Sequence, residues 1–427
     1  MSRLEPLQQP VDQLTGDYSA KTHPDTKPIR VKVLVLRGGG GHYASFRAIR
    51  EILAQRFPHW QVDPLFADSL GQQSKKQGAS KVSQTVSTGS DQFYDFILQH
   101  GLGWVHLLTV HIHKVITRLK HRLDVSLLAE EWQQTQPDLV LSVVPFQNRA
   151  LGESVQQSLP ATPVVSILTD FADSPPAYWM APTTDNYVVC GTDKAAAQAL
   201  SAGVKPSRII QTSGLVIHPQ FYQASPSDIA ERRQQLGLDP QCTTGLVLFG
   251  ANGAQVMTEI ADRLAAFGDR LQLIFLCGRN QAVAQAIREQ ATQQKRAVIG
   301  FTDRIPDYMR LADFFIGKPG NVSVSEAIAM NLPTIVEHNW LTLPQESYAA
   351  DWLKKHQAGL SVSSFKHICA AVETLIEPEN FARYQANVRA LNNRAVFEIP
   401  EMLQTILGDA AEPSTIRPAR TQQGGGL

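Results

Sequence analysis

The 427-residue chain is predicted to be an α/β protein with two Rossmann-like domains, each built on a doubly wound parallel sheet. Short runs rich in Val, Ile and Leu alternate with longer helical patterns, which is typical of βαβ units. The chain is also longer than one hydrophobic core usually allows, and about 150 residues per domain favours two domains.

The expected strands fall into two sets, separated by a polar stretch with Gly and Pro at residues 213–228. The first set comprises 31–36, 60–66, 138–144, 163–169, 186–190 and 208–213, and the second comprises 245–250, 271–278, 296–301, 313–317 and 333–337. Each set is large enough for its own sheet, so the hinge is placed between them. The predicted organisation is a disordered segment 1–29, an N-terminal domain 30–214, a C-terminal domain 215–408 and a disordered tail 409–427.

The overall composition excludes general binding to polyanions. There are 39 basic and 39 acidic residues, so no nucleic-acid partner is expected. The four cysteines form no C-x-x-C pair and lack histidines at metal-ligand spacing, which favours a reducing compartment. The N-terminus lacks the apolar core of a signal peptide, and no apolar run is long enough to span a bilayer. A cytoplasmic protein that touches membranes only at their surface is therefore expected.

A run of four glycines, residues 38–41, ends the first expected strand and is followed by His42 and a helical pattern. Glycines at such a turn let a ligand approach the backbone at the helix N-terminus. The run lacks the Lys and Ser/Thr of a Walker A loop. It fits a dinucleotide fingerprint through Gly39, Gly41, Ala44 and Asp63. Two other interpretations stay open: an acceptor-substrate loop into which His42 reaches, and a tight turn with a capping histidine.

The stretch KPGNVSVSEA, residues 318–327, places a Lys-Pro-Gly turn before a helix whose first turn is expected to hold Ser323, Ser325 and Glu326. Hydroxyls and free backbone N–H groups at a helix start suit a diphosphate, and a carboxylate one turn in can accept both hydroxyls of a ribose. The same residues also suit a capped helix with an acid at its positive end. Taken alone, the stretch leaves both interpretations open.

The motifs together resemble glycosyltransferase family 28, whose members have the GT-B fold with a cleft between two Rossmann-like domains. The branch that the chain resembles most is that of the monogalactosyldiacylglycerol synthases and diacylglycerol glucosyltransferases. The segments that match are GGGHYAS (39–45), SVVPFQ (142–147), LTDF (168–171), SGLVIHPQF (213–221), CGRN (277–280), GFTDRIPDYM (300–309), KPGNVSVSEA (318–327) and LPQES (343–347). The GlcNAc transferase branch has a second Gly-rich loop in place of SVVPFQNRA, so the glycolipid branch is favoured.

The resemblance implies inverting transfer of a hexose from a UDP-sugar, held by the C-terminal domain, to a lipid acceptor such as diacylglycerol. Phe301 would pair with the uracil through its backbone, the turn 318–325 would hold the diphosphate, and Glu326 would bind the ribose. The implied donor-binding residues are Gly250, Asn252, Gly253, Arg279, Phe301, Lys318, Pro319, Gly320, Asn321, Ser323, Ser325, Glu326, Gln345 and Glu346. The implied acceptor-side residues are Gly39, Gly40, Gly41, Pro145 and Gln147. Ala251 and Asn252 interrupt the family's glycine run, which leaves the geometry of that loop open.

Transfer needs a base that takes the proton of the acceptor hydroxyl, and His42 and Asp170 are the candidates. His42 has an ordinary pKa of about 6.5, whereas Asp170 would need its pKa raised by burial. Either residue could instead be structural, as a helix cap or an ordinary strand-end aspartate. The chain holds no D-x-D pair for a metal-bound diphosphate, so no cofactor and no metal requirement are expected.

The segment 100–123 carries Lys114, Arg118, Lys120 and Arg122 and no acidic residue. This composition suits a helix on an anionic membrane surface at the cytoplasmic face, and equally a core helix with a solvated basic end. The polar stretch 71–92 is read as a loop that could cover the acceptor.

Other functions stay open besides glycolipid synthesis. They are a GlcNAc transferase for a polyprenyl-linked acceptor, a nucleotide-sugar epimerase or hydrolase, a non-catalytic nucleotide-sugar-binding relative, and an NAD-dependent oxidoreductase. UDP should stabilise a transferase or an epimerase, and NAD only the oxidoreductase. No motif identifies the hexose.

Overall fold

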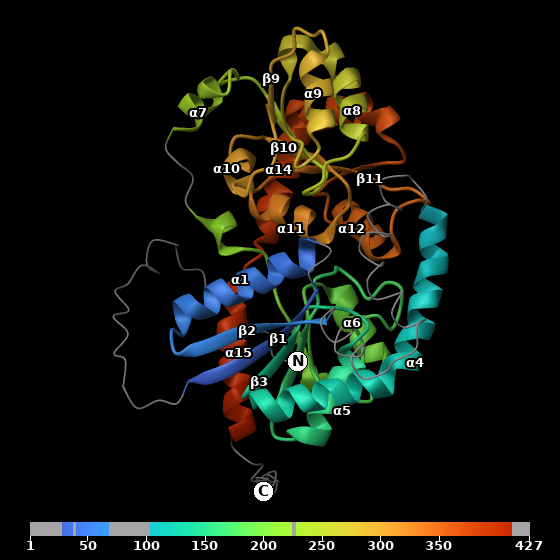
Figure 1. Ribbon diagram of the computed structural model, residues 1–427. Coiled ribbons are helices and arrows are strands. Elements are labelled where there is room, and N and C mark those ends of the chain that lie inside the picture. Colours follow the sequence, from blue (N-terminus) through green and yellow to red (C-terminus); the bar gives the residue numbers. More distant parts are fainter. Residues whose placement is uncertain (1–27, 37–39, 68–102, 224–227, 412–427) are drawn as a thin grey trace, which may run out of the picture.

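The computed structural model describes residues 28–36, 40–67, 103–223 and 228–411, without side-chain surroundings for residues 40, 103–118, 409 and 411. The chain forms two lobes, each organised around a parallel sheet of six strands (Figure 1). This two-domain α/β arrangement confirms the predicted fold class. Order extends slightly beyond the predicted limits, because β1 begins at Ile29 and α15 ends at Ala411.

The N-terminal sheet has the strand order β2-β1-β3-β4-β5-β6. Its strands are β1 (Ile29–Val35), β2 (Trp60–Phe66), β3 (Leu139–Ser142), β4 (Val164–Ile167), β5 (Tyr187–Cys190) and β6 (Ile209–Gln211). The helices around it are α1 (Gly40–Arg56), α4 (Gly103–Thr135), α5 (Asn148–Ser158), α6 (Asp193–Ser201) and the short η2 (Pro206–Arg208). Every residue of β3 and β4 is buried, as parallel strands covered by helices on both faces should be.

The C-terminal sheet has the order β12-β11-β10-β7-β8-β9, which is the strand order of a Rossmann fold. Its strands are β7 (Thr244–Leu248), β8 (Gln272–Leu276), β9 (Arg296–Ile299), β10 (Phe314–Gly317), β11 (Thr334–Glu337) and β12 (Gly359–Val362). Its helices are α7 (Ile229–Gln235), α8 (Val256–Leu264), α9 (Gln281–Glu289), α10 (Ile305–Met309), α11 (Asn321–Ala329), α12 (Pro344–Lys355), α13 (Ile368–Ile376) and α14 (Pro378–Leu391), with the short η3 (Pro219–Tyr222), η4 (Ala265–Arg270) and η5 (Phe365–His367).

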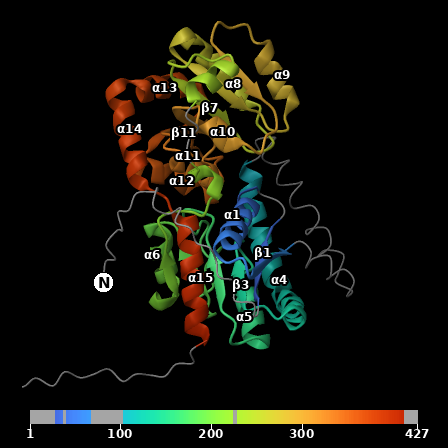
Figure 2. The same ribbon diagram turned by 90° about the vertical axis from the view of Figure 1, so that its left-hand side faces the viewer.

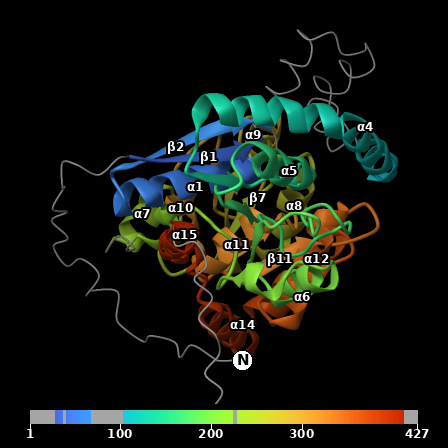
Figure 3. The ribbon, with the colours of Figure 1, turned by 90° about the horizontal axis from the view of Figure 1, so that it is seen from below.

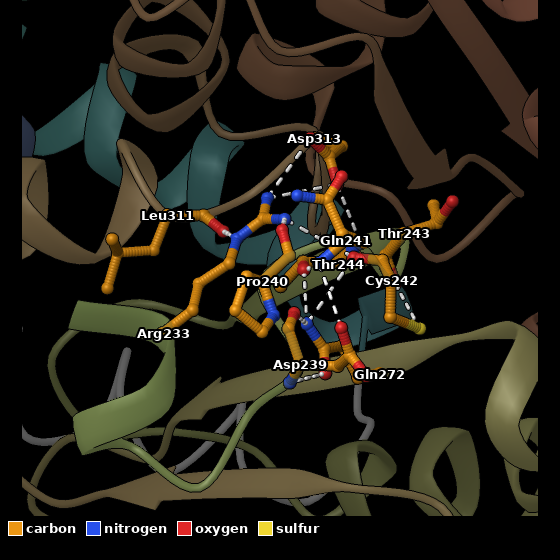
Figure 4. A network of polar contacts seen from close by, with 10 residues as sticks. All are labelled: Arg233, Asp239, Pro240, Gln241, Cys242, Thr243, Thr244, Gln272, Leu311 and Asp313. Atoms are coloured by element: carbon orange, nitrogen blue, oxygen red, sulfur yellow. Dashed lines mark hydrogen bonds and ion pairs between the residues drawn. The ribbon is translucent and has the colours of Figure 1, made fainter. Parts of the chain in front are cut away.

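A polar network ties α7 to the amino ends of the C-terminal strands (Figure 4). The buried Arg233 donates from Nη2 to both carboxylate oxygens of Asp313, at 3.2 and 3.1 Å. Asp313 also accepts the backbone N–H of Thr244, the first residue of β7, at 2.7 Å. The network lies at the opposite end of these strands from the candidate site described below.

The last helix, α15 (Ala395–Ala411), leaves the C-terminal domain and lies along the N-terminal one (Figure 2). Its residues Val396, Ile399 and Leu403 share a buried core with Val33 and Ile49. The apolar face of α15 therefore completes the N-terminal core. This differs from the predicted C-terminal domain 215–408, which includes most of the helix, while the boundary at residues 214 and 215 stays a prediction.

Helix α4 follows one side of the N-terminal domain, next to α5 (Figure 3). In its second half Leu128 and Trp132 are fully buried, and Trp132 Nε1 donates to Ser154 Oγ of α5 at 2.8 Å. This half is a core helix. The side chains of Lys114 and Arg118 and the whole stretch 71–92 lie outside the described residues. Among the helices that the structure describes, none has the length and apolar composition needed to cross a bilayer.

Candidate active site

The carboxyl ends of the two sheets face each other, and the predicted site residues lie there. Strand order reverses beside β1 and β3 in the N-terminal sheet, and beside β7 and β10 in the C-terminal sheet. Open α/β sheets bind their ligands at such positions. Helix α1 follows β1 and lies just below α11, which follows β10 (Figure 1). The two helix starts touch, because a Cβ atom on Gly41 would lie 3.1 Å from Val322 Cγ2.

The His42 ring, in the first turn of α1, is held by groups of the protein. Its Nδ1 is 2.9 Å from Thr169 Oγ1, which follows β4. A further hydrogen bond joins the ring to the backbone of Val143, after β3. Burial lowers the pKa of His42 to about 4, and the bond with Val143 opposes this only in part. The imidazole is therefore neutral at pH 7.

Asp170, also after β4, is 8% exposed and lies between the two domains. Its Oδ2 accepts a hydrogen bond from Trp179 Nε1 at 2.8 Å, and its Oδ1 accepts one from Asn321 Nδ2 at 2.7 Å. Burial raises the pKa of Asp170 to about 7, against the effect of these two donors. The charges of Glu346 and Asp173 raise the pKa further. The carboxyl group thus titrates close to neutral pH.

Trp179, which no motif had singled out, connects the two predicted bases. Its ring centre is 6.2 Å from that of His42, and its N–H bonds to Asp170. The Trp179 loop is fixed by Asp173, whose Oδ1 accepts the backbone N–H groups of Tyr178 and Trp179, both at 2.9 Å. The signal available in the sequence was this second aspartate, three residues after Asp170.

The turn before α11 gathers a group of the predicted donor residues. Lys318 Nζ and Glu346 Oε1 form an ion pair at 2.7 Å. Asn321 Nδ2 donates to the backbone oxygen of Gln345 at 3.1 Å, in addition to its bond with Asp170. A Cβ atom on Gly320 would lie 3.7 Å from Glu346 Oε1. Because it bonds to Asp170, the side chain of Asn321 is directed at the N-terminal domain. Pro319, in the same turn, is buried.

Glu326 lies in the second turn of α11 rather than the first, because the helix begins at Asn321. Burial raises the pKa of its carboxyl to about 8, and no described residue donates a hydrogen bond to it. Ser325 Oγ bonds back to the Asn321 carbonyl at 2.8 Å, while Ser323 is partly exposed. A half-buried carboxyl group without a protein donor is suited to the hydroxyl groups of a ligand.

The loops after β7 and β8 form a tight pair despite the interrupted glycine run. Gly253 has φ +59, and a Cβ atom there would lie 2.4 Å from the Cys277 oxygen. The backbone N–H of Arg279 donates to the Ala251 oxygen at 2.8 Å. Gly250 also has a positive φ of +73. The loop after β7 therefore keeps glycine at the two of its positions whose backbone favours it.

Arg279 and Phe301 lie together next to these loops. The guanidinium carbon of Arg279 is 4.2 Å from the centre of the Phe301 ring. The ring is 57% exposed, which is unusual for a phenylalanine without a partner surface. Asn252, in the preceding loop, is exposed.

The predicted acceptor side is only partly described. Gln147, before α5, has a buried Oε1 without a hydrogen-bond partner among the described residues, and Pro145 is buried. Gly41 faces Val322 of the protein itself, Gly39 lies outside the described residues, and Gly40 begins α1.

The dinucleotide alternative finds no matching acid in the described residues. Asp63 lies within β2, three positions before its end, whereas a dinucleotide site needs an acid at the strand end. Within the described ranges, no three His, Cys, Asp or Glu side chains are grouped so that they could hold a metal ion.

Further contacts hold the two domains against each other at this site. The rings of Phe171 and Trp352 stack with centres 4.8 Å apart, and Lys194 Nζ is 3.9 Å from the centre of the Tyr348 ring. Asp170 and Asn321 are thus enclosed between two packed domains.

Two family models match the chain. Residues 81–217 match the model described as "Monogalactosyldiacylglycerol (MGDG) synthase", and residues 245–361 match "Glycosyltransferase family 28 C-terminal domain". The matches follow one another in the two domains and together span more than half of the chain.

Relatives in other organisms extend over most of the chain. The "Processive diacylglycerol beta-glucosyltransferase" of Bacillus subtilis is 25% identical over 378 residues, which are 85% of this chain and 91% of the relative. The "Probable monogalactosyldiacylglycerol synthase 2, chloroplastic" of Oryza sativa subsp. indica is 28% identical over 72% of this chain. The chain spans 65% of the length of that rice protein.

Solved structures share the fold. The MurG protein of Acinetobacter baumannii superposes with a TM-score of 0.57 at 13% identity, over 88% of this chain and 100% of that one. The MnaA protein of S. aureus, solved with UDP, superposes with a TM-score of 0.59 at 13% identity, over 90% and 99%. The two family models together identify the chain as a member of glycosyltransferase family 28 that is similar to the monogalactosyldiacylglycerol synthases and diacylglycerol glucosyltransferases.

Proposed function

We propose that the chain transfers a hexose from a UDP-sugar to diacylglycerol at the surface of a membrane, with inversion at the anomeric carbon. The names of its relatives favour a diacylglycerol acceptor. The assignment of a UDP-sugar donor rests on Glu326. Its carboxyl group lies in the helix after β10 and receives no hydrogen bond from the described residues.

The surroundings of Glu326 provide complementary groups for the rest of a UDP-sugar. Two ribose hydroxyls can each donate to the Glu326 carboxylate, whose pKa of about 8 would fall when those donors arrive. The start of α11 and Lys318 offer positive charge to the diphosphate. The exposed Arg279 and Phe301 would face the uracil, and Gln345 and Glu346 would contact the sugar. These groups would stabilise the leaving diphosphate without a metal ion.

Asp170 is the better candidate for the base. A general base works best when its pKa lies near the working pH, and the pKa is about 7 for Asp170 but about 4 for His42. Each oxygen of Asp170 accepts one described hydrogen bond and can accept another. The acceptor oxygen would bond to the anomeric carbon as the bond to the diphosphate breaks, and its proton would pass to Asp170. His42 would then orient the acceptor.

The test incubates the purified chain with radiolabelled UDP-glucose or UDP-galactose and diacylglycerol in anionic lipid vesicles, with and without EDTA. Labelled glycosyldiacylglycerol, formed equally with EDTA, is the expected product. The Glu326→Gln variant should lose both transfer and the stabilisation of the fold by UDP. Free sugar or an epimerised UDP-sugar without any labelled lipid would contradict the proposal and favour the hydrolase or epimerase alternative.

A further inference from the structure

We propose that Asn321 is a positioning residue that holds the Asp170 carboxylate from the opposite domain, so that the base is aligned only while the donor-binding helix is docked against it. This inference rests on the proposed function. Asn321 is the first residue of α11, and Asp170 lies 151 positions earlier, after β4. Their 2.7 Å hydrogen bond crosses from one domain to the other.

The geometry of the Asn321 amide leaves it little freedom. Nδ2 has two hydrogens, one donated to Asp170 Oδ1 and the other to the Gln345 oxygen at 3.1 Å. Oδ1 faces the backbone N–H of Phe171 at a longer 3.5 Å. The side chain is 6% exposed. An amide is the side chain that supplies two such donors and an acceptor in one plane, so an aliphatic replacement loses all three contacts.

The two hydrogen bonds to Asp170 come from different domains. Trp179 belongs to the same domain as Asp170 and holds Oδ2 in any arrangement of the two domains. Asn321 holds Oδ1 only when α11 is close. The backbone atom that orients Asn321 belongs to Gln345, a predicted sugar contact. The same amide therefore contacts both the base and the segment expected to bind the transferred sugar.

Both donors favour the ionised form of Asp170, which is the form that accepts a proton. The charged groups that face this carboxyl are Asp173 on its own loop and Glu346 on α12, and both oppose ionisation. Glu346 is itself paired with Lys318. Loss of the Asn321 donor should therefore move the midpoint of Asp170 ionisation to higher pH and turn the carboxylate away from its working orientation.

A titration without substrate tests the contact directly. Carbon-13 NMR of chain labelled at its aspartate carboxyls would follow Asp170, with its resonance assigned by its absence in Asp170→Asn. We expect Asn321→Ala to raise the Asp170 midpoint by about one pH unit, the scale of one hydrogen bond to a charged group. Asn321→Asp, which keeps the shape but replaces the donor with a charge, should raise it further.

The matched control is Asn393→Ala. Asn393 is 7% exposed and donates to the Leu215 oxygen where the chain crosses between the domains, but it does not touch Asp170. A general loosening of the two domains would move the Asp170 midpoint in both variants. An equal shift in Asn393→Ala, or no shift in Asn321→Ala, would overturn the proposal.

Kinetics give an independent readout. Asn321→Ala should lower kcat about tenfold while leaving UDP affinity within about twofold, and in an Asp170→Asn background it should have almost no further effect. Losses that multiply in the double variant would contradict a role through Asp170. An inactive wild-type chain would refute the proposed function. The NMR titration would still decide on the Asn321 contact, because it needs no substrate.

Discussion

Gly41 and Val322 bring the two domains of this protein into contact at the candidate site. Gly41 lies at the start of α1 and Val322 in the first turn of α11, and a Cβ atom on the glycine would lie 3.1 Å from Val322 Cγ2. The Val322 side chain also packs against the core of the C-terminal domain. The missing side chain at residue 41 therefore lets the helix that carries His42 approach the helix of the predicted donor site.

The first prediction concerns this contact. Gly41→Ala should destabilise the packed arrangement by about 1–3 kcal/mol, because the added methyl group overlaps Val322. Urea unfolding and sugar transfer would both report the loss. The double variant with Val322→Ala should recover most of it, since that change removes the atom in the way. A double variant no better than Gly41→Ala alone would mean that the glycine serves another purpose.

The second prediction concerns Glu326 and stability. Its pKa is about 8 in the folded protein and about 4.5 in the unfolded chain, so the folded state binds more protons between these values. Stability from this group therefore falls as the pH rises from about 4.5 to 8. Without ligand, Glu326→Gln should be more stable than the wild type by up to a few kcal/mol at pH 9 and nearly equal at pH 4.5. Thermal unfolding at the two pH values measures the difference, and a constant difference would contradict the assignment.

The third prediction separates the two candidate bases. If Asp170 takes the proton, kcat/KM should fall as the pH drops below about 7, because the carboxyl becomes protonated. Asp170→Asn should then lose about 10²–10⁴-fold in transfer with UDP binding retained. His42→Ala should lose less and keep the fall near pH 7. A fall near pH 4, with the larger loss in His42→Ala, would make the histidine the base.

The fourth prediction concerns the network around Arg233, far from the site. Arg233→Met should cost about 1.5–3 kcal/mol, because it removes the hydrogen bonds between the buried guanidinium and the partly exposed Asp313 carboxylate. Arg270→Met is the matched control, since Arg270 and Glu373 form an exposed pair worth about 0–1 kcal/mol. UDP affinity per folded molecule should stay unchanged in both variants. Equal losses of stability would show that burial does not set the cost at Arg233.

The local signals in the sequence predicted the fold well because each depends on neighbours along the chain. Strand runs such as 139–142 and 245–248 are apolar because helices cover both faces of a parallel sheet, and that burial leaves a readable pattern. The packing of α15 against the N-terminal domain could not be predicted, because it does not depend on neighbours along the chain. Its amphipathic pattern predicts a helix but not which of two sheets its apolar face will cover.

The sequence by itself determined the two βαβ sets and the family motifs that nominate His42, Asp170 and the stretch 318–326. Tertiary structure alone decided how those residues meet. It placed Trp179 between the two candidate bases and directed Asn321 toward Asp170. A hydrogen bond between residues 151 positions apart depends on how two domains dock, and docking leaves no periodic trace in either segment. The pKa values near 7 and 8 follow from the same enclosure, because burial of a carboxyl group is a property of the folded chain.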